Sequence, residues 1–246
     1  MSFYNKWFGR TGVTRERTSR ERAFFLILVL CVSTGCGSFW ASVREGERSR
    51  SEKQANTYFK GGRCQRALDQ LDRSEAAQDL GSYASDATYQ RAVCLEKLGH
   101  KEAARANYLM ILDFYPESRV KPLAMKQLAE PEFRDGFSKD QAGLSPLPMP
   151  SQVEMPGSRY SEAAERSGLV GDTVLVFTLE ADQSVSGIRV LKMGHPLLAS
   201  WAIESVSQAT LREKAAPLPL PMQIITRVVF SSHWHGDGQE VSQEPK

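Results

Sequence analysis

The spacing of apolar and polar residues divides this chain into segments of different character. Apolar residues first form an unbroken run and then recur at helical spacing. Prolines follow, and after them apolar and polar residues alternate as in strands. We therefore expect an α+β protein. The predicted segments are a signal peptide or membrane anchor at 1–35, a helical domain at 51–130, a proline-rich linker at 136–157, a mixed domain at 158–232 and a polar tail at 233–246.

The apolar run at 23–32 follows the charged sequence Arg20-Glu21-Arg22. A basic flank stays in the cytoplasm while the apolar run enters the bilayer, so we expect everything downstream to be exported. The sequence Ser33-Thr34-Gly35-Cys36 resembles the lipobox of bacterial lipoproteins, in which a peptidase cuts before the cysteine and a lipid is attached to its sulfur. The resemblance implies that Cys36 is a lipid attachment site.

A second interpretation of the N-terminal segment stays open. No charged residue lies between Arg22 and Arg44, so residues 23–43 approach the roughly 20 residues that a spanning helix needs. Phe39 and Trp40 would then lie at the far interface, where aromatic rings are enriched. Both interpretations predict a membrane-anchored protein of the cell envelope with periplasmic domains, and neither says which membrane holds it.

The helical segment contains an internal repeat in two copies. Alanine lets helices approach, glycine turns the chain with a positive φ, and proline stops a helix. The pattern resembles the tetratricopeptide repeat, a pair of antiparallel helices, and a plain bundle of helical hairpins is the alternative. The residues assigned to repeat packing are Ala55, Tyr58, Gly62, Ala67, Ala92, Gly99, Ala104, Tyr108 and Pro116.

Two more features belong to this segment. The glycines of the two copies are 37 residues apart, so we expect a longer loop around residues 79–85. After the second copy, Pro122 predicts the first turn of a capping helix that contains Leu123, Met125 and Leu128 and runs to about Glu130.

The segment after the linker predicts two helices and three strands. The prolines of the linker itself disfavour a packed helix or strand, so we expect it to be extended. The second helix carries one apolar face that includes Leu198, Trp201 and Val206. The expected elements are a helix at 160–168, strands at 173–180 and 185–192 joined by a hairpin, a helix at 196–210 and a strand at 222–230.

The order of these elements resembles the TonB C-terminal domain family, through Gly171-Asp172-Thr173-Val174, His195-Pro196 and Val228-Val229-Phe230. The resemblance implies a β-β-α-β fold whose sheet has an edge strand. A free edge accepts an extended peptide by strand addition, and we expect this edge at 222–230. A homodimer contact or the C-terminal tail is the alternative occupant. The candidate peptide-binding residues are Gln223, Ile225, Arg227 and Val229.

Charge distribution argues against nucleic acid as a partner. The whole chain carries a formal net charge of +2, and residues 1–35 alone carry +4, so the remainder is near −2. The excess of basic residues is therefore confined to the N-terminal segment, where it indicates membrane topology and not nucleic-acid binding.

Candidate chemistry is sparse. Cys64 and Cys94 have no metal-site spacing, and whether they are bridged stays open. His233 and His235 lie two residues apart without a third ligand, and His195 stands at a helix start, where a turn role is expected. No catalytic triad or phosphate-binding loop is present. We expect no enzyme activity, no metal and no cofactor.

These features together predict an exported, membrane-anchored protein-protein interaction protein that binds envelope proteins or peptides. A TonB-type energy transducer for outer-membrane transport is one alternative, and a structural envelope scaffold is another.

Overall fold

The computed structural model describes residues 41–77, 80–134, 145–157, 160–212 and 218–231. Residues 44–246 form one compact unit, and the fold given below is that of its described residues. The expectations for residues 1–35, Cys36, the first part of the linker and the tail lie outside the described residues. None of the helices that the structure describes is both long and apolar enough to cross a membrane.

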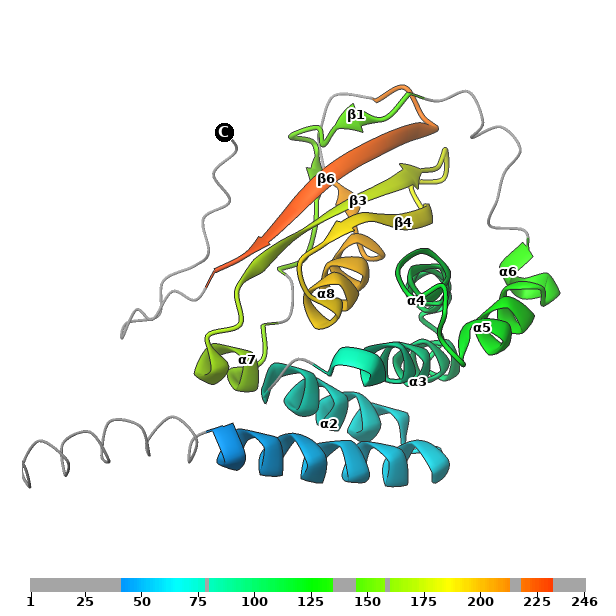
Figure 1. Ribbon diagram of the computed structural model, residues 1–246. Coiled ribbons are helices and arrows are strands. Elements are labelled where there is room, and N and C mark those ends of the chain that lie inside the picture. The colour runs from blue at the N-terminus through cyan, green and yellow to red at the C-terminus, as the bar shows by residue number, and fades with distance from the viewer. Residues whose placement is uncertain (1–40, 78–79, 135–144, 158–159, 213–217, 232–246) are drawn as a thin grey trace, which may run out of the picture. The chain divides into compact units, whose positions relative to one another are not determined.

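The fold is mixed α+β, with helices first and a four-stranded mixed sheet after them (Figure 1). The helical part covers 44–134 and the sheet part covers 145–231. The elements of the helical part are a helix whose described residues are 41–60, α2 (Cys64–Ala77), η1 (Gly81–Tyr83), α3 (Ala84–Lys97), α4 (Lys101–Phe114), α5 (Lys121–Leu128) and α6 (Pro131–Arg134).

Glycines close the turns of the two helical hairpins, as the spacing predicts. Gly62, between the first helix and α2, has φ +68°, and Gly99, between α3 and α4, has φ +87°. Side chains are disfavoured at such angles, so glycine is needed at both positions. The loop expected around 79–85 contains the short helix η1.

The capping helix predicted after the second repeat is α5, with proline in its first turn. Its packing differs from the prediction. Only Ala124 is buried, whereas Leu123 and Met125 are about half exposed. Leu123 and Met125 therefore face outward, while Leu128 is partly buried against the core.

The three predicted strands of the sheet part are present almost at the expected bounds. The strands β3 (Gly171–Leu179) and β4 (Val185–Met193) form the expected antiparallel hairpin, and β6 (Met222–Phe230) pairs antiparallel with the other side of β3. The order across the sheet is β1-β6-β3-β4 (Figure 1). The alternation of buried and outward residues along β6 follows the strand period of two.

The linker prediction is wrong for its second half. Residues 147–154 hold two short strands: β1 (Leu147–Pro148) pairs parallel with β6, and β2 (Val153–Glu154) pairs with β5 (Thr210–Leu211). Val153 is buried in the core. Proline is tolerated here because β1 is an edge strand, where a missing N–H breaks no central ladder.

The helix α8 (Pro196–Val206) is buried almost all round, although the sequence suggested a single apolar face. Leu197, Ala199 and Ile203 are as inaccessible as the residues of the predicted face. One side of α8 packs on β3 and β4, while α4, α3 and α2 cover the other side (Figure 1). Helix α8 therefore lies inside a single continuous core that the helical and sheet parts share.

Candidate functional site

The outer edge of β6 is the first candidate binding site. β1 pairs only with Ile224 and Ile225, so within the described residues no strand pairs with that edge from Thr226 to Phe230. The pairing of β1 with β6 stops after two residues because Pro148 and Pro150 lack the N–H groups needed to continue the hydrogen-bond ladder. The expectation that β6 is the outermost strand therefore needs correction at Ile224 and Ile225 only.

The opposite edge of the sheet differs, because a helix lies against β4. Arg189 of β4 makes two hydrogen bonds to the Asp113 carboxylate of α4, of 2.9 and 2.8 Å. Burial raises the pKa of Glu102 of α4, and the nearby Arg105 and the backbone N–H of Gly187 on β4 oppose the rise. Helix α4 therefore lies beside β4, and no described strand pairs with the outer edge of that strand.

The side chains of the four predicted binding residues on β6 lie on the face of the sheet opposite the one that packs in the core. Gln223 and Ile225 are partly buried, whereas Arg227 and Val229 are exposed, Val229 by 58%. Arg227 Nε lies 2.9 Å from Asp172 Oδ2 on β3, and Lys192 Nζ of β4 lies 3.7 Å from the same oxygen. This face therefore combines an exposed valine with two cations that share one carboxylate.

A second candidate surface is a depression at the turn that follows α4. Its volume is about 600 Å³, within the size range of ligand sites. Arg119 makes two 3.1 Å hydrogen bonds to Asp86 across its rim. Aromatic walls beside a charged pair suit the side chains of a bound peptide. The lining residues are Tyr83, Ser85, Asp86, Phe114, Tyr115, Pro116, Glu117, Ser118 and Arg119.

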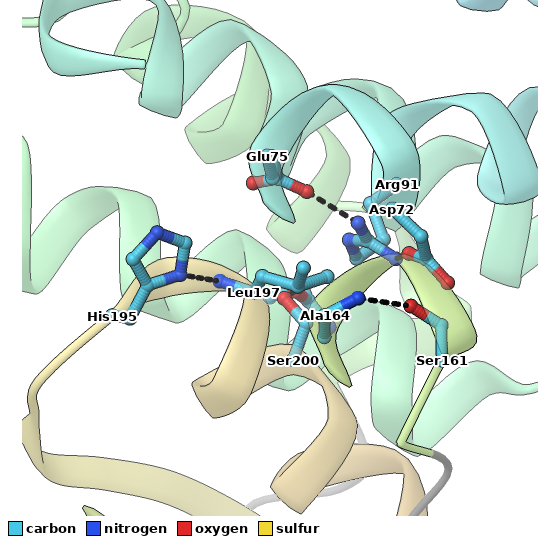
Figure 2. Close-up of polar contacts among 9 residues, drawn as sticks. Asp72, Glu75, Arg91, Ser161, Ala164, His195, Leu197 and Ser200 are labelled. Atoms are coloured by element: carbon cyan, nitrogen blue, oxygen red, sulfur yellow. Dashed lines mark hydrogen bonds and ion pairs between the residues drawn. The ribbon is translucent and has the colours of Figure 1, made fainter. Parts of the chain in front are cut away.

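A buried charge cluster lies beneath the surface where α2 and α3 meet. Figure 2 shows Asp72 and Glu75 of α2 converging on the guanidinium group of Arg91 of α3. Arg91 Nη1 lies 2.7 Å from Asp72 Oδ1, and Nη2 donates to Glu75 Oε2. All three side chains are almost inaccessible to solvent. One guanidinium thus faces two buried carboxylates.

The charges in this cluster do not balance. Burial alone would lower the pKa of Arg91, but Asp72 and Glu75, with a smaller effect from Glu204, raise it overall. Burial raises the pKa of Glu75, and the attraction of Arg91 only partly opposes this rise. The folded state therefore favours the protonated, neutral form of Glu75, because the Asp72 carboxylate already balances the charge of Arg91.

Most of the predicted repeat-packing residues lie in the core of the helical part. Ala55, Ala67, Ala92, Ala104 and Tyr108 are buried, and Tyr58 is partly buried. The Tyr108 hydroxyl donates a 2.7 Å hydrogen bond to Glu96. Helix α4 ends at Phe114, two residues before Pro116.

The expected turn role of His195 is confirmed. His195 caps α8, and its Nδ1 accepts a 3.2 Å hydrogen bond from the N–H of Leu197 (Figure 2). Ser161 caps α7 (Glu162–Ser167) in the same way. His233 and His235 lie outside the described residues, and among the described residues no group of metal-binding side chains gathers.

Sequence reasoning missed the charge cluster, although a signal was available. Asp72 and Glu75 continue the helical face of Leu68 and Leu71, so they occupy core positions of α2. Carboxylates at core positions require a buried cation. The partner, Arg91, could not be chosen without the packing of α3.

No known protein family, curated protein or solved structure matches this chain. Its function has to be inferred from its own residues and geometry.

Proposed function

We propose that this chain is an exported, membrane-anchored interaction protein of the cell envelope, with a tetratricopeptide-like helical part and a TonB-like sheet part that bind envelope proteins or peptides. The observation that carries the proposal is the outer edge of β6 from Thr226 to Phe230, to which no described strand pairs. An edge strand presents N–H and C=O groups that an extended peptide satisfies by strand addition.

The surroundings of this edge suit a peptide better than a small molecule. Val229 offers an exposed apolar contact, and Arg227 offers a cation to an acidic residue of the peptide. Alternate side chains of an added strand point to this face, so a peptide with apolar and acidic residues two positions apart matches it.

The compact arrangement favours an adaptor over a TonB-type energy transducer. A transducer needs a long spacer to carry force across the periplasm, but part of the linker pairs with β6 and with β5 instead. The buried side of α8 also packs directly on the helical part. Deletion of the chain should therefore leave energised uptake through outer-membrane receptors unchanged. Loss of that uptake would favour the transducer.

Photocrosslinking in the native envelope tests the proposal. A photoreactive residue in place of Val229 should capture a partner protein through an extended segment. The same residue in place of Leu191 is the matched control, because Leu191 is an apolar, half-exposed residue on β4. Capture at Val229 alone supports the adaptor. Equal capture at both positions, or crosslinks only to a second copy of this chain, would contradict it.

A further inference from the structure

The depression at the turn after α4 is walled by aromatic rings and carboxylates. One wall comes from η1 and the first turn of α3, which supply Tyr83 and Asp86. The other wall comes from the end of α4 and the turn behind it, which supply Phe114, Tyr115 and Glu117. The short helix η1 belongs to the longer loop that the glycine spacing predicted, so that loop builds one side of the depression.

A hydrogen bond ties the two walls together. The Ser118 hydroxyl donates to the Ser85 hydroxyl at 2.8 Å and accepts the N–H of Val120 at 3.2 Å. The N–H of Ser118 also donates to the Tyr115 carbonyl at 3.0 Å, which closes the turn. The shape of the depression is therefore fixed by bonds of the folded chain. A site formed before its ligand arrives loses less free energy to ordering on binding.

Arg119 shows which chemical group fits this depression. Its Nε and Nη2 atoms donate 3.1 Å hydrogen bonds to different oxygens of the Asp86 carboxylate. Pairing through both oxygens is the geometry by which a carboxylate recognises a guanidinium group. The Arg119 side chain is 77% exposed, whereas that of Asp86 is 20% exposed. The carboxylate therefore belongs to the wall, and the arginine approaches it from the solvent.

The place that Arg119 occupies is open to a cation from another chain. An exposed ion pair contributes little net free energy, because its long side chain loses freedom and water screens the charges. Apart from Arg119, the charged side chains among the described lining residues are those of Asp86 and Glu117. Tyr83, exposed by 50%, and Tyr115 add aromatic rings, whose faces attract cations. The lining is therefore complementary to a positively charged ligand.

We propose that this depression is a binding site for an arginine side chain of a partner polypeptide, in which Asp86 pairs with the guanidinium group and the aromatic rings contact it. Arg119 stands in for the ligand when no partner is bound. The volume of about 600 Å³ is larger than one side chain needs, so residues next to the arginine fit as well. The site lies in the helical part, and it depends neither on the edge of β6 nor on an exported location.

Arginine suits this site better than lysine. A guanidinium group is planar and donates two parallel hydrogen bonds to one carboxylate, whereas an ammonium group acts as a point charge. Guanidinium also stacks on aromatic rings. The helical part contains an example, because the guanidinium carbon of Arg63 lies 4.7 Å from the centroid of the Tyr58 ring. A lysine side chain should therefore bind at Asp86 more weakly than an arginine side chain.

Titration of the full chain with small probes tests the proposal. The isotope-labelled chain is kept in a maltoside detergent and titrated with N-acetyl-arginine methylamide to tens of millimolar, a range that covers weak binding of a single residue. N-acetyl-citrulline methylamide is the matched probe, because it keeps the shape of the side chain and lacks the charge. The arginine probe should shift the amide NMR signals of residues 83–86 and 114–119 to saturation, and the citrulline probe should not.

Two variants identify the groups that bind the cation. Asp86→Asn removes the charge from the wall and should abolish saturation by the arginine probe. Arg119→Met removes the competing cation, and since exposed pairs are weak it should tighten binding of the arginine probe by up to about fivefold. Glu154→Gln is the control, because Glu154 also pairs with an arginine, Arg212, but lies outside the depression. That variant should bind the arginine probe as the unsubstituted chain does.

Several results would overturn the proposal. The first is an arginine titration that produces no saturating shifts at residues 83–86 and 114–119. The second is equal binding of the citrulline probe, or of N-acetyl-lysine methylamide, because the site would then not select a guanidinium group. The third is weaker binding of the arginine probe to Arg119→Met, which would show that Arg119 holds the ligand. The probes are compared on the unsubstituted chain, so they decide the question even if Asp86→Asn fails to fold.

Discussion

Ser200 of α8 donates a 2.8 Å hydrogen bond to the side-chain oxygen of Asn107 on α4, and both side chains are buried. The two residues lie 93 positions apart, one in the sheet part and one in the helical part. A polar pair sealed inside the core can satisfy its groups only when both parts are folded and docked. This contact therefore links the folding of the two parts.

Asn107→Ala should destabilise both parts together. The substitution leaves the Ser200 hydroxyl buried without its acceptor and removes the hydrogen bond from Asn107 to the Ala103 carbonyl. We expect the free energy of unfolding to fall by about 2 kcal/mol. Hydrogen exchange measured by mass spectrometry should show lower protection in α4 and in α8 alike.

The control for this prediction is Arg189→Ala, which removes an exposed ion pair between the same two parts. Exposed pairs contribute only about 0 to 1 kcal/mol, so protection should hardly change. Loss of protection in α4 alone after Asn107→Ala would contradict the linked folding of the two parts.

Arg91→Met should be among the most damaging substitutions in the helical part. It leaves Asp72 and Glu75 buried without a cation. Removing one member of a buried ion pair costs about 3 to 5 kcal/mol. Arg119→Met is the matched control, because Arg119 pairs with Asp86 at the surface and should cost less than about 1 kcal/mol. Urea unfolding of both variants checks the difference, and equal losses would contradict the burial of the cluster.

Glu75 should make stability depend on pH. Its ordinary pKa of 4.5 is raised by burial, so the folded chain keeps a proton that the unfolded chain loses. This contribution is fully present below about pH 4.5 and is lost as the pH rises through the higher pKa of the folded state. Glu75→Gln keeps a neutral hydrogen-bonding side chain, so its Tm should exceed that of the unsubstituted chain increasingly from about pH 4.5 upward.

The matched control for this pH dependence is Glu162→Gln, since Glu162 is largely exposed. Its Tm should stay close to that of the unsubstituted chain. A Glu75→Gln difference that stays constant between about pH 4 and pH 8 would contradict the prediction.

Elements fixed by local chemistry were predictable from the sequence. Gly62 and Gly99 predicted turns, because other residues are strained at positive φ. The β-branched residues of 222–230 predicted the strand β6. Elements decided by tertiary packing were not. Pro148 predicted an extended linker. In the structure it lies in an edge strand, and that position depends on pairing with the distant strand β6, which the local sequence does not show.

The candidate site divided in the same way. Strand alternation predicted which residues of β6 face outward. It did not predict that β1 pairs with Ile224 and Ile225 of β6. The full burial of Ala199 and Ile203 in α8 also went unpredicted, because it depends on α4 docking from another part of the chain. Ile203 and Leu197, apolar residues outside the predicted face, were the available signal for a second packing partner.

Cys36→Ser tests the membrane anchor. If Cys36 carries a lipid, the substitution should block processing, so the chain should run at a larger apparent size and lose its lipid label. An inhibitor of the lipoprotein signal peptidase should have the same effect on the unsubstituted chain. Unchanged size and labelling would favour an uncut helix at 23–43 instead.

Amide hydrogen exchange along β6 tests the central claim most directly. With the partner captured by crosslinking added to the full chain, residue-resolved exchange is compared in the free and bound states. Strand addition predicts slower exchange of the outward-facing amides between Thr226 and Phe230, with little change along β4. Unchanged exchange of those β6 amides while the partner is bound would contradict the account.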